Sequence, residues 1–176
     1  MAYKYGFETI IHMPMEAHNI KANHHNKYLL TTDLDFNEVN NRIKNAFIEN
    51  PNALGINNHQ GSKATEDFQL MKYVAKSLKQ LNKYFLDSYT SINSKAYLTM
   101  RQNGVKTEIR QVFLDNVNHS DSIRKNIDKL IKLSHSMDVA IGIGHVKEET
   151  YKVLKEQIPI LKEMGYEFLS VSEVVK

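Results

Sequence analysis

Polar side chains that could bind a metal ion or move a proton stand directly after short apolar runs in this sequence. They are His12, the triplet Asn57-Asn58-His59, the pair Asp87-Ser88, the pair Asp115-Asn116, and His145. Imidazole and carboxylate groups are suitable ligands for a divalent metal such as zinc. An imidazole beside a carboxylate is also suited to general acid–base catalysis. These residues are therefore a candidate site for metal binding or acid–base chemistry, provided that the fold brings them together.

The apolar runs before these residues are the elements that must position them. Each run has about four to eight mostly apolar residues without helical spacing, which indicates a buried strand. The intervals from 59 to 87, 87 to 115 and 115 to 145 are 28, 28 and 30 residues, about one strand and one helix each. The carboxyl ends of parallel strands meet on one face, and that face carries the active site in such folds. We therefore expect all five polar groups on one rim.

The pattern predicts six strands separated by amphipathic helices. The strands are expected over 8–12, 53–57, 84–87, 109–114, 139–143 and 167–171. Helices are expected to begin at caps formed by Asp33 or Asp35 and by Thr65, and three later helices are expected to begin near 94, near 120 or 122, and near 148. This alternation is typical of parallel α/β proteins.

The segment after the first strand contains further histidines. Pro14 should end the pairing of that strand and turn the chain, so that His12 and Glu16 approach one another. The following residues, 17–33, are expected to form a surface loop that carries three more imidazoles, on His18, His24 and His25.

Composition excludes several classes of protein. The 176 residues suit a single domain, and no linker or low-complexity stretch divides them. The net charge of +3 is spread without a basic block, so we expect no nucleic-acid partner. The chain has no Cys, which excludes disulfides and thiolate metal sites. No apolar run approaches ~18 residues, so we expect no membrane span, and the first residues lack the core of a signal peptide.

Five motifs at the strand ends resemble the divergent polysaccharide deacetylase family, a distant branch of the metal-dependent carbohydrate esterases. They occur in the family's order and cover nearly the whole chain. The motifs are HMPME at 12–16, GINNHQGS at 55–62, FLDSYTS at 85–91, VFLDN at 112–116, and IGH at 143–145 followed by Thr150 and Leu154. The resemblance implies a parallel (β/α) barrel whose site binds a metal and a carbohydrate.

The start of the sequence departs from the family pattern. Family members begin with a strand that ends in Asp-Asp-x-Gly, which supplies a metal ligand and a general base, and a second strand follows. This chain starts roughly where the third strand would. We therefore expect one domain over 1–176 that lacks the first two strands, with a barrel that is incomplete and open at its N-terminal edge. Exposed sheet edges recruit other chains, so a homo-oligomer could form there.

The resemblance also implies an activity and its ligands. The expected reaction removes acetyl groups from a carbohydrate with water activated by zinc or another divalent metal. His12 and His59 would bind the metal, with Glu16 or Asp87 as the oxygen donor. The alternative is a catalytically inactive carbohydrate-binding module of the same fold, because the Asp-Asp pair is missing. The family suggests the cell envelope or secretion.

Two acid–base roles complete the expected site. His145 resembles the family's proton donor. Asp115 could be a ligand, or could orient His145 and favour its cationic form. Hydrogen bonds to sugar hydroxyls or to a developing oxyanion would come from amide and hydroxyl groups, namely Asn57, Asn58, Ser88 and Asn116. Simpler roles stay open: Asp87-Ser88 and Asp115-Asn116 could cap turns, and His12 could be a core histidine.

Overall fold

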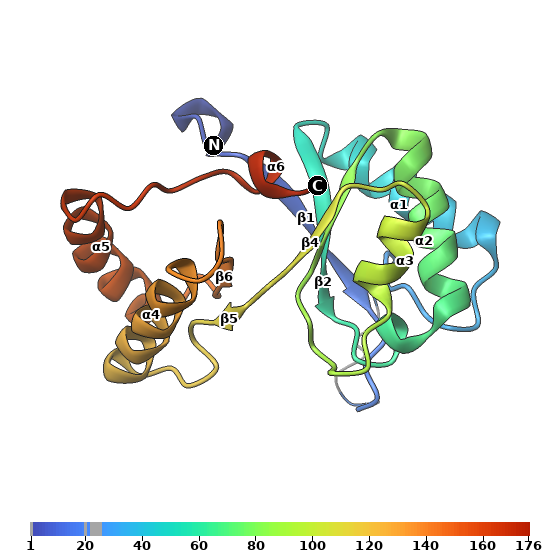
Figure 1. Ribbon diagram of the computed structural model, residues 1–176. Helices are drawn as coiled ribbons and strands as arrows, with labels where there is room; N and C mark the ends of the chain where they lie inside the picture. The colour runs from blue at the N-terminus through green and yellow to red at the C-terminus, as the bar shows by residue number, and fades with distance from the viewer. Residues whose placement is uncertain (1, 20, 22–25) are drawn as a thin grey trace. The chain divides into compact units, whose positions relative to one another are not determined.

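The computed structural model describes residues 2–19, 21 and 26–176 (Figure 1). The predicted surface histidines His24 and His25 lie outside the described residues. Strands and helices alternate along the described chain, and every strand pair in it is parallel. The predicted α/β class with a parallel sheet is therefore confirmed. The opening of a barrel at the N-terminal edge stays a prediction.

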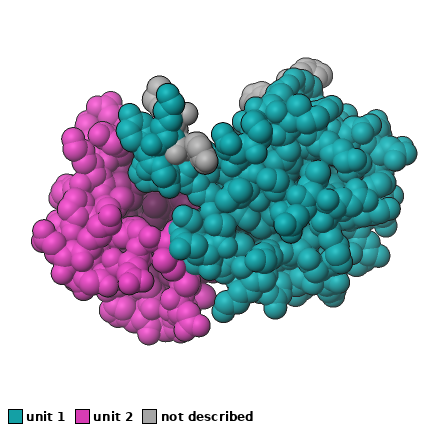
Figure 2. Space-filling view, turned by 90° about the horizontal axis from the view of Figure 1, so that it is seen from above, with its two compact units in different colours: residues 1–109, 170–176 teal, residues 110–169 magenta. Residues whose placement is uncertain are grey.

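The chain divides into two compact units, which Figure 2 colours separately. Unit 1 comprises Met1–Ile109 and Ser170–Lys176, and unit 2 comprises Arg110–Leu169. The expectation of one domain over 1–176 stays a prediction.

Unit 1 is built on a four-stranded parallel sheet with the order β1-β2-β3-β4. The strands are β1 (Thr9–Met15), β2 (Ala53–Gln60), β3 (Tyr84–Asp87) and β4 (Thr107–Ile109). His12 pairs with Asn57, which in turn pairs with Leu86. Residues that pair across neighbouring strands point to the same face of a sheet. The register therefore places the His12 and Asn57 side chains on one face of unit 1.

The opposite face of this sheet packs against helices. These are α1 (Phe36–Glu49), α2 (Phe68–Leu81) and α3 (Ala96–Gln102). Two short 3-10 helices, η1 (Ala2–Tyr5) and η3 (Ala64–Glu66), precede β1 and α2 respectively. The core between them is formed by apolar side chains that alternate along the strands with the polar ones, such as Met13, Met15, Ile56 and Phe85, and by the buried stripes of α1 and α2. Period-two alternation in the strands thus separates the core face from the face that carries His12.

The N-cap of α1 is one of the residues predicted from the sequence, whereas the N-cap of α2 is not. Asp35, one of the two predicted candidates, caps α1, and it forms a capping box with Glu38 that was not predicted. The prediction that Thr65 caps α2 is wrong, because Asp67 accepts from the Leu70 N–H at 2.7 Å. Thr65 lies in η3 instead and donates its hydroxyl to the Gly61 carbonyl at 2.8 Å. The chain therefore makes one extra turn before α2 begins.

Pro14 does not end β1, contrary to the prediction. The strand continues through it to Met15, which pairs with Gln60. The Pro14 carbonyl accepts from the Leu30 N–H at 2.9 Å, on the side of β1 that faces away from β2. The N–H that proline lacks would lie on that same side, so the ladder to β2 loses no bond. Self-association through such a sheet edge stays a prediction.

Unit 2 contains a short parallel pair, β5 (Val112–Phe113) and β6 (Gly142–Ile143), with α4 (Ser120–Ser134) and α5 (Glu148–Glu163). Its core is separate from that of unit 1 and contains Val112, Leu114, Ile123, Ile127, Val153 and Leu161. The prediction of one strand over 109–114 is wrong. Residues 110–111 separate β4, which pairs with β3, from β5, which pairs with β6.

The predicted strand over 167–171 is also absent. Phe168 and Leu169 are about half exposed, and the short helix α6 (Val171–Val174) begins where a strand was expected to end. Ser170 and Glu173 form a capping box, with the Ser170 N–H donating to Glu173 at 2.7 Å. Helix-start chemistry therefore prevails over a short apolar run. No helix in the described part of the chain has the length and apolar character needed to cross a membrane.

Candidate functional site

The polar residues at the strand ends fall into two groups, one in each unit. His12, Asn57, Asn58, His59, Asp87 and Ser88 belong to unit 1, whereas Asp115, Asn116 and His145 belong to unit 2. The convergence of both groups on one rim stays a prediction.

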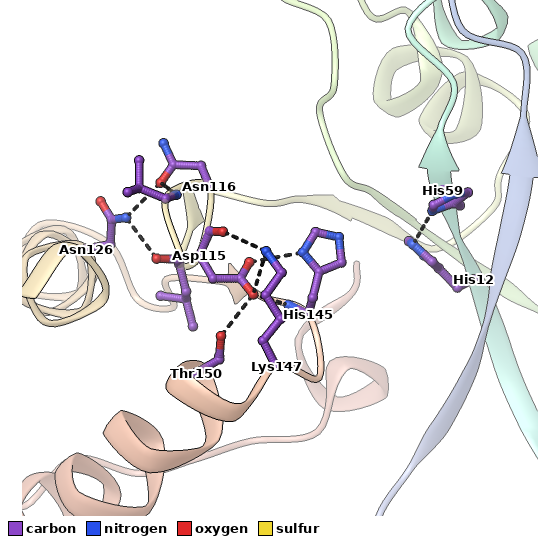
Figure 3. Close-up of polar contacts among 10 residues, drawn as sticks. His12, His59, Asp115, Asn116, Asn126, His145, Lys147 and Thr150 are labelled. Carbon is purple, nitrogen blue, oxygen red and sulfur yellow. Dashed lines mark hydrogen bonds and ion pairs between the residues drawn. The ribbon is translucent and has the colours of Figure 1, made fainter. Parts of the chain in front are cut away.

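His12 and His59 form an imidazole pair on β1 and β2 (Figure 3). His12 Nε2 lies 3.0 Å from His59 Nδ1, and the two rings meet edge to face. Asn57 Oδ1 lies 3.0 Å from His12 Nδ1. The Asn57 amide is oriented by its other end, because Nδ2 donates to Ser88 Oγ at 3.0 Å. Asn57 therefore accepts the Nδ1 proton of His12, which leaves the Nε2 lone pair directed at His59.

The imidazole pair has the donor chemistry of two positions in a zinc site. Two nitrogens that bind one zinc ion at about 2.0–2.1 Å with a tetrahedral angle lie roughly 3.3 Å apart, close to the 3.0 Å between His12 and His59. Metal-binding histidines usually donate their second N–H to an oxygen, as His12 does to Asn57. No cluster of three or more potential ligands forms among the residues that the structure describes. The pair thus fits part of a metal shell.

Glu16 and Asp87, the predicted oxygen donors, make other contacts. Glu16 accepts from Lys63 Nζ at 2.7 Å and from the N–H and hydroxyl of Thr32 at 2.9 Å each. Burial raises the pKa of Glu16, but the bonds from Lys63 and Thr32 outweigh burial and lower that pKa overall. The expected approach of His12 and Glu16 was based on a turn at Pro14, which the structure replaces with continuous strand.

Asp87 is wholly buried at the end of β3 and stabilises the turn that follows. Its carboxylate accepts from the Tyr89 N–H at 2.8 Å and from Ser94 Oγ at 2.7 Å. This is the turn-capping role that the sequence left open. The assignment of Asp87 and Glu16 as metal ligands stays a prediction.

Asn58 joins the end of β2 to the loop that follows β3. Its Oδ1 accepts from the Ser88 N–H at 2.8 Å, and its Nδ2 donates to the Gln60 carbonyl at 2.7 Å. The side chain is only 1% exposed. Asn58 therefore holds Ser88 in place, and Ser88 in turn receives the Asn57 bond that orients His12. Sequence spacing alone could not distinguish this supporting role from the predicted contact with a sugar.

Asp115 and His145 form a carboxylate–imidazole dyad in unit 2 (Figure 3). His145 Nδ1 lies 3.1 Å from Asp115 Oδ1, while Oδ2 accepts from the His145 backbone N–H at 2.8 Å and from Thr150 Oγ1 at 2.9 Å. The Asp115 side chain is fully buried, whereas that of His145 is 49% exposed. The dyad thus presents a ring whose Nδ1 is held from behind, with its other nitrogen available for proton transfer.

The charge of Asp115 is stabilised by these bonds. Burial raises the pKa of Asp115, but the hydrogen bonds from the His145 N–H, the Thr150 hydroxyl and the His145 ring together lower it overall. Lys147 adds a cation, with Nζ 3.8 Å from Oδ2 and donating to the Asp115 carbonyl at 3.2 Å. Asp115 is therefore ionised at neutral pH, in the orienting role that the sequence allowed.

Two partners of Asp115 had no predicted role. Thr150 lies in the first turn of α5 and is 3% exposed. Its place in the family motif after His145 was a signal that could have identified it as a partner of the dyad. Nothing in the sequence marked Lys147. Asn116, expected to bind substrate, accepts from the Val117 N–H at 3.0 Å and from Asn126 Nδ2 at 3.2 Å. These contacts are typical of a turn residue.

Two curated bacterial proteins are similar in sequence to this chain. It is 34% identical over 157 residues to the uncharacterized protein YibQ of Escherichia coli K12, with 89% of this chain and 49% of YibQ aligned. It is 33% identical over 158 residues to an uncharacterized protein of Haemophilus influenzae Rd, with 90% of this chain and 56% of that protein aligned. The chain thus spans about half the length of the curated relatives it matches.

A solved structure has the same fold. The crystal structure of the uncharacterized protein ATU2773 from Agrobacterium tumefaciens C58 superposes with a TM-score of 0.94 at 19% identity, over 99% of this chain and 71% of that one. The divergent polysaccharide deacetylase family matches residues 1–175, which confirms the resemblance seen in the motifs. This protein therefore belongs to the divergent polysaccharide deacetylase family.

Proposed function

We propose that the chain takes part in the hydrolytic removal of acetyl groups from a carbohydrate, with a divalent metal bound through His12 and His59. Family membership supports the reaction class. The observation that carries the proposal is the 3.0 Å separation of His12 Nε2 and His59 Nδ1, with the His12 tautomer set by Asn57. When bound, the metal supplies a Lewis acid that activates water and polarises the acetyl carbonyl.

His145 acts on the leaving group in this proposal. Hydrolysis forms a bond from the acetyl carbon to a water oxygen and breaks the bond from that carbon to the sugar nitrogen or oxygen. The departing atom needs a proton, which His145 donates from Nε2 while Asp115 holds Nδ1. The proton released from the water needs a base, which the family resemblance assigns to the Asp-Asp-x-Gly strand that residues 1–176 do not contain.

Zinc binding tests the role of the imidazole pair. Loss of a residue that only hydrogen-bonds a metal ligand weakens metal affinity by roughly 10–100-fold. His12→Ala and His59→Ala should each weaken zinc affinity by more than that, because each removes a ligand. Asn57→Ala should fall within that range, because it removes only the oxygen that orients His12. Equilibrium dialysis with zinc measures all three variants.

His135→Ala is the matched control for zinc binding. Its ring is exposed and contacts the Tyr166 hydroxyl at 2.6 Å, so its loss removes an imidazole without touching the pair. Equal zinc affinity in wild type and His12→Ala would refute the metal site. Carbohydrate binding that persists unchanged in a chelator, without hydrolysis, would instead support the binding-module alternative.

The role of His145 is tested by comparing leaving groups. His145→Ala should slow release of acetyl from an N-acetylated sugar by about 10²–10⁴-fold, the usual contribution of a general acid. Hydrolysis of a 4-nitrophenyl acetate ester should change little, because that leaving group departs without a proton. The two rates are measured on one preparation that has hydrolytic activity, so misfolding would lower both. Equal losses on both substrates, in a variant whose circular dichroism spectrum and unfolding midpoint match wild type, would exclude His145 as the proton donor.

A further inference from the structure

A basic groove lies on the surface of unit 1, along α2 and the end of α3. Its volume is about 680 Å³. Eight side chains line it, namely Gln69, Lys72, Tyr73, Lys76, Lys79, Gln80, Gln102 and Asn103. Three lysines, four carboxamide side chains and one tyrosine thus line the groove, and the lining contains no acidic residue. The groove is formed by helices, whereas the imidazole pair is on the strands β1 and β2.

The charges of this groove are not compensated locally. The helix α2 carries Lys72, Lys76 and Lys79 but no Asp or Glu. Among the described residues, no ion pair involves these three lysines, whereas Lys152 on α5 pairs with Glu148 at 2.8 Å. Like charges three or four residues apart on a helix repel one another. An anion in the groove would relieve that repulsion.

Neighbouring groups limit the freedom of the ammonium groups. Lys76 Nζ lies 4.0 Å from the centre of the Phe36 ring, and Lys72 Nζ lies 4.5 Å from that of Phe68. Such cation–π contacts hold an exposed lysine in place. The cost in side-chain entropy of binding an anion is therefore smaller than for freely rotating lysines.

We propose that this basic groove binds an anionic glycan, a sugar chain that carries repeated carboxylate groups. The lysines would pair with the carboxylates, which accept hydrogen bonds from ammonium groups. The carboxamides both donate and accept, so they suit sugar hydroxyls. The groove would hold a part of the sugar chain that carries no reacting acetyl group. This binding does not depend on the metal or on the proposed hydrolysis.

Polygalacturonate is a suitable probe, with neutral dextran as the uncharged counterpart. The full chain, without added metal, should bind polygalacturonate and not dextran in calorimetric titrations near physiological salt. The triple variant Lys72→Gln, Lys76→Gln, Lys79→Gln should lose roughly tenfold or more in affinity, as expected for the loss of three exposed ion pairs.

The helix α4 provides a matched control. Lys125, Lys129 and Lys132 have the same spacing as the groove lysines and are also exposed. Their triple replacement by Gln makes the same change in net charge, so polygalacturonate affinity should stay within about twofold of wild type. Circular dichroism shows whether both variants remain folded.

Three results would overturn the proposal. An equal loss in both triple variants would show attraction to net charge alone. Inorganic phosphate could displace polygalacturonate when the two anions are present at equal concentrations of negative charge. That result would show that the groove is a site for small anions. Tighter binding of a DNA duplex, lost in the groove variant alone, would assign the groove to nucleic acid.

Discussion

Replacing Asp115 by alanine is expected to destabilise the protein by about 2–5 kcal/mol, because two or more donors lose their acceptor inside unit 2. The Thr150 hydroxyl and the His145 backbone N–H both donate to Asp115 Oδ2, and Thr150 is only 3% exposed. Denaturant unfolding followed by circular dichroism measures the loss. Asp128→Ala removes an exposed acid from α4 and should change stability by less than about 0.5 kcal/mol.

The same carboxylate predicts how stability depends on pH. The folded-state pKa of Asp115 is lowered, so its ionised form contributes fully above the ordinary aspartate value of about 3.9. That contribution is lost as the pH falls through the lowered folded-state pKa. The stability difference between wild type and Asp115→Asn should therefore be constant at neutral pH and shrink in acid. A difference that remained unchanged in strong acid would mean that the Asp115 charge contributes nothing.

The Gly55→Ala change is expected to cost about 1–3 kcal/mol, the usual penalty for overpacking. A Cβ at Gly55 would lie 2.4 Å from a carbon of the Tyr84 ring. The ring has little freedom to move, because its residue pairs with Gly55 in the sheet and its hydroxyl donates to Glu8. Burial and the bond to Glu8 raise the pKa of Tyr84 above its usual range, so this hydroxyl remains a donor.

A double-mutant cycle separates this clash from other effects of the new methyl group. Tyr84→Ala removes the ring, so Gly55→Ala should cost much less in that background than in wild type. Leu54→Ala, on the same strand but with the side chain 45% exposed, provides the matched control. Equal costs of Gly55→Ala in both backgrounds would rule out Tyr84 as the cause.

The sequence predicted the residue pairs of the site better than the supporting elements. His12 with His59, and Asp115 with His145, follow apolar runs, and the structure brings both pairs together. Strand ends can be predicted from sequence, because an apolar run followed by a polar residue is a local pattern. The roles of Asn58 and Thr150 depend instead on register between segments about 30 or more residues apart, which no local pattern encodes.

The wrong predictions have local physical causes. Pro14 was expected to stop a strand, but an edge strand tolerates proline where its missing N–H faces away from its neighbour. The run at 167–171 looked like a strand, yet Ser170 and Glu173 already had capping-box spacing. For 167–171 a capping signal within the run outweighed the strand pattern, whereas for Pro14 the edge position of β1 made the simple rule fail.

The bond from the Ser172 N–H to Glu8, at 3.2 Å, joins α6 to the segment before β1 across 164 residues of sequence. The Thr107 N–H likewise donates to the Lys176 carbonyl at 3.1 Å, so residues 170–176 contribute to the sheet of unit 1. On the ribosome, β1 to β4 emerge before unit 2, and α6 emerges after it. Unit 1 therefore cannot complete its own contacts until unit 2 has been synthesised, which links the maturation of the imidazole pair's sheet to residues that are translated after unit 2.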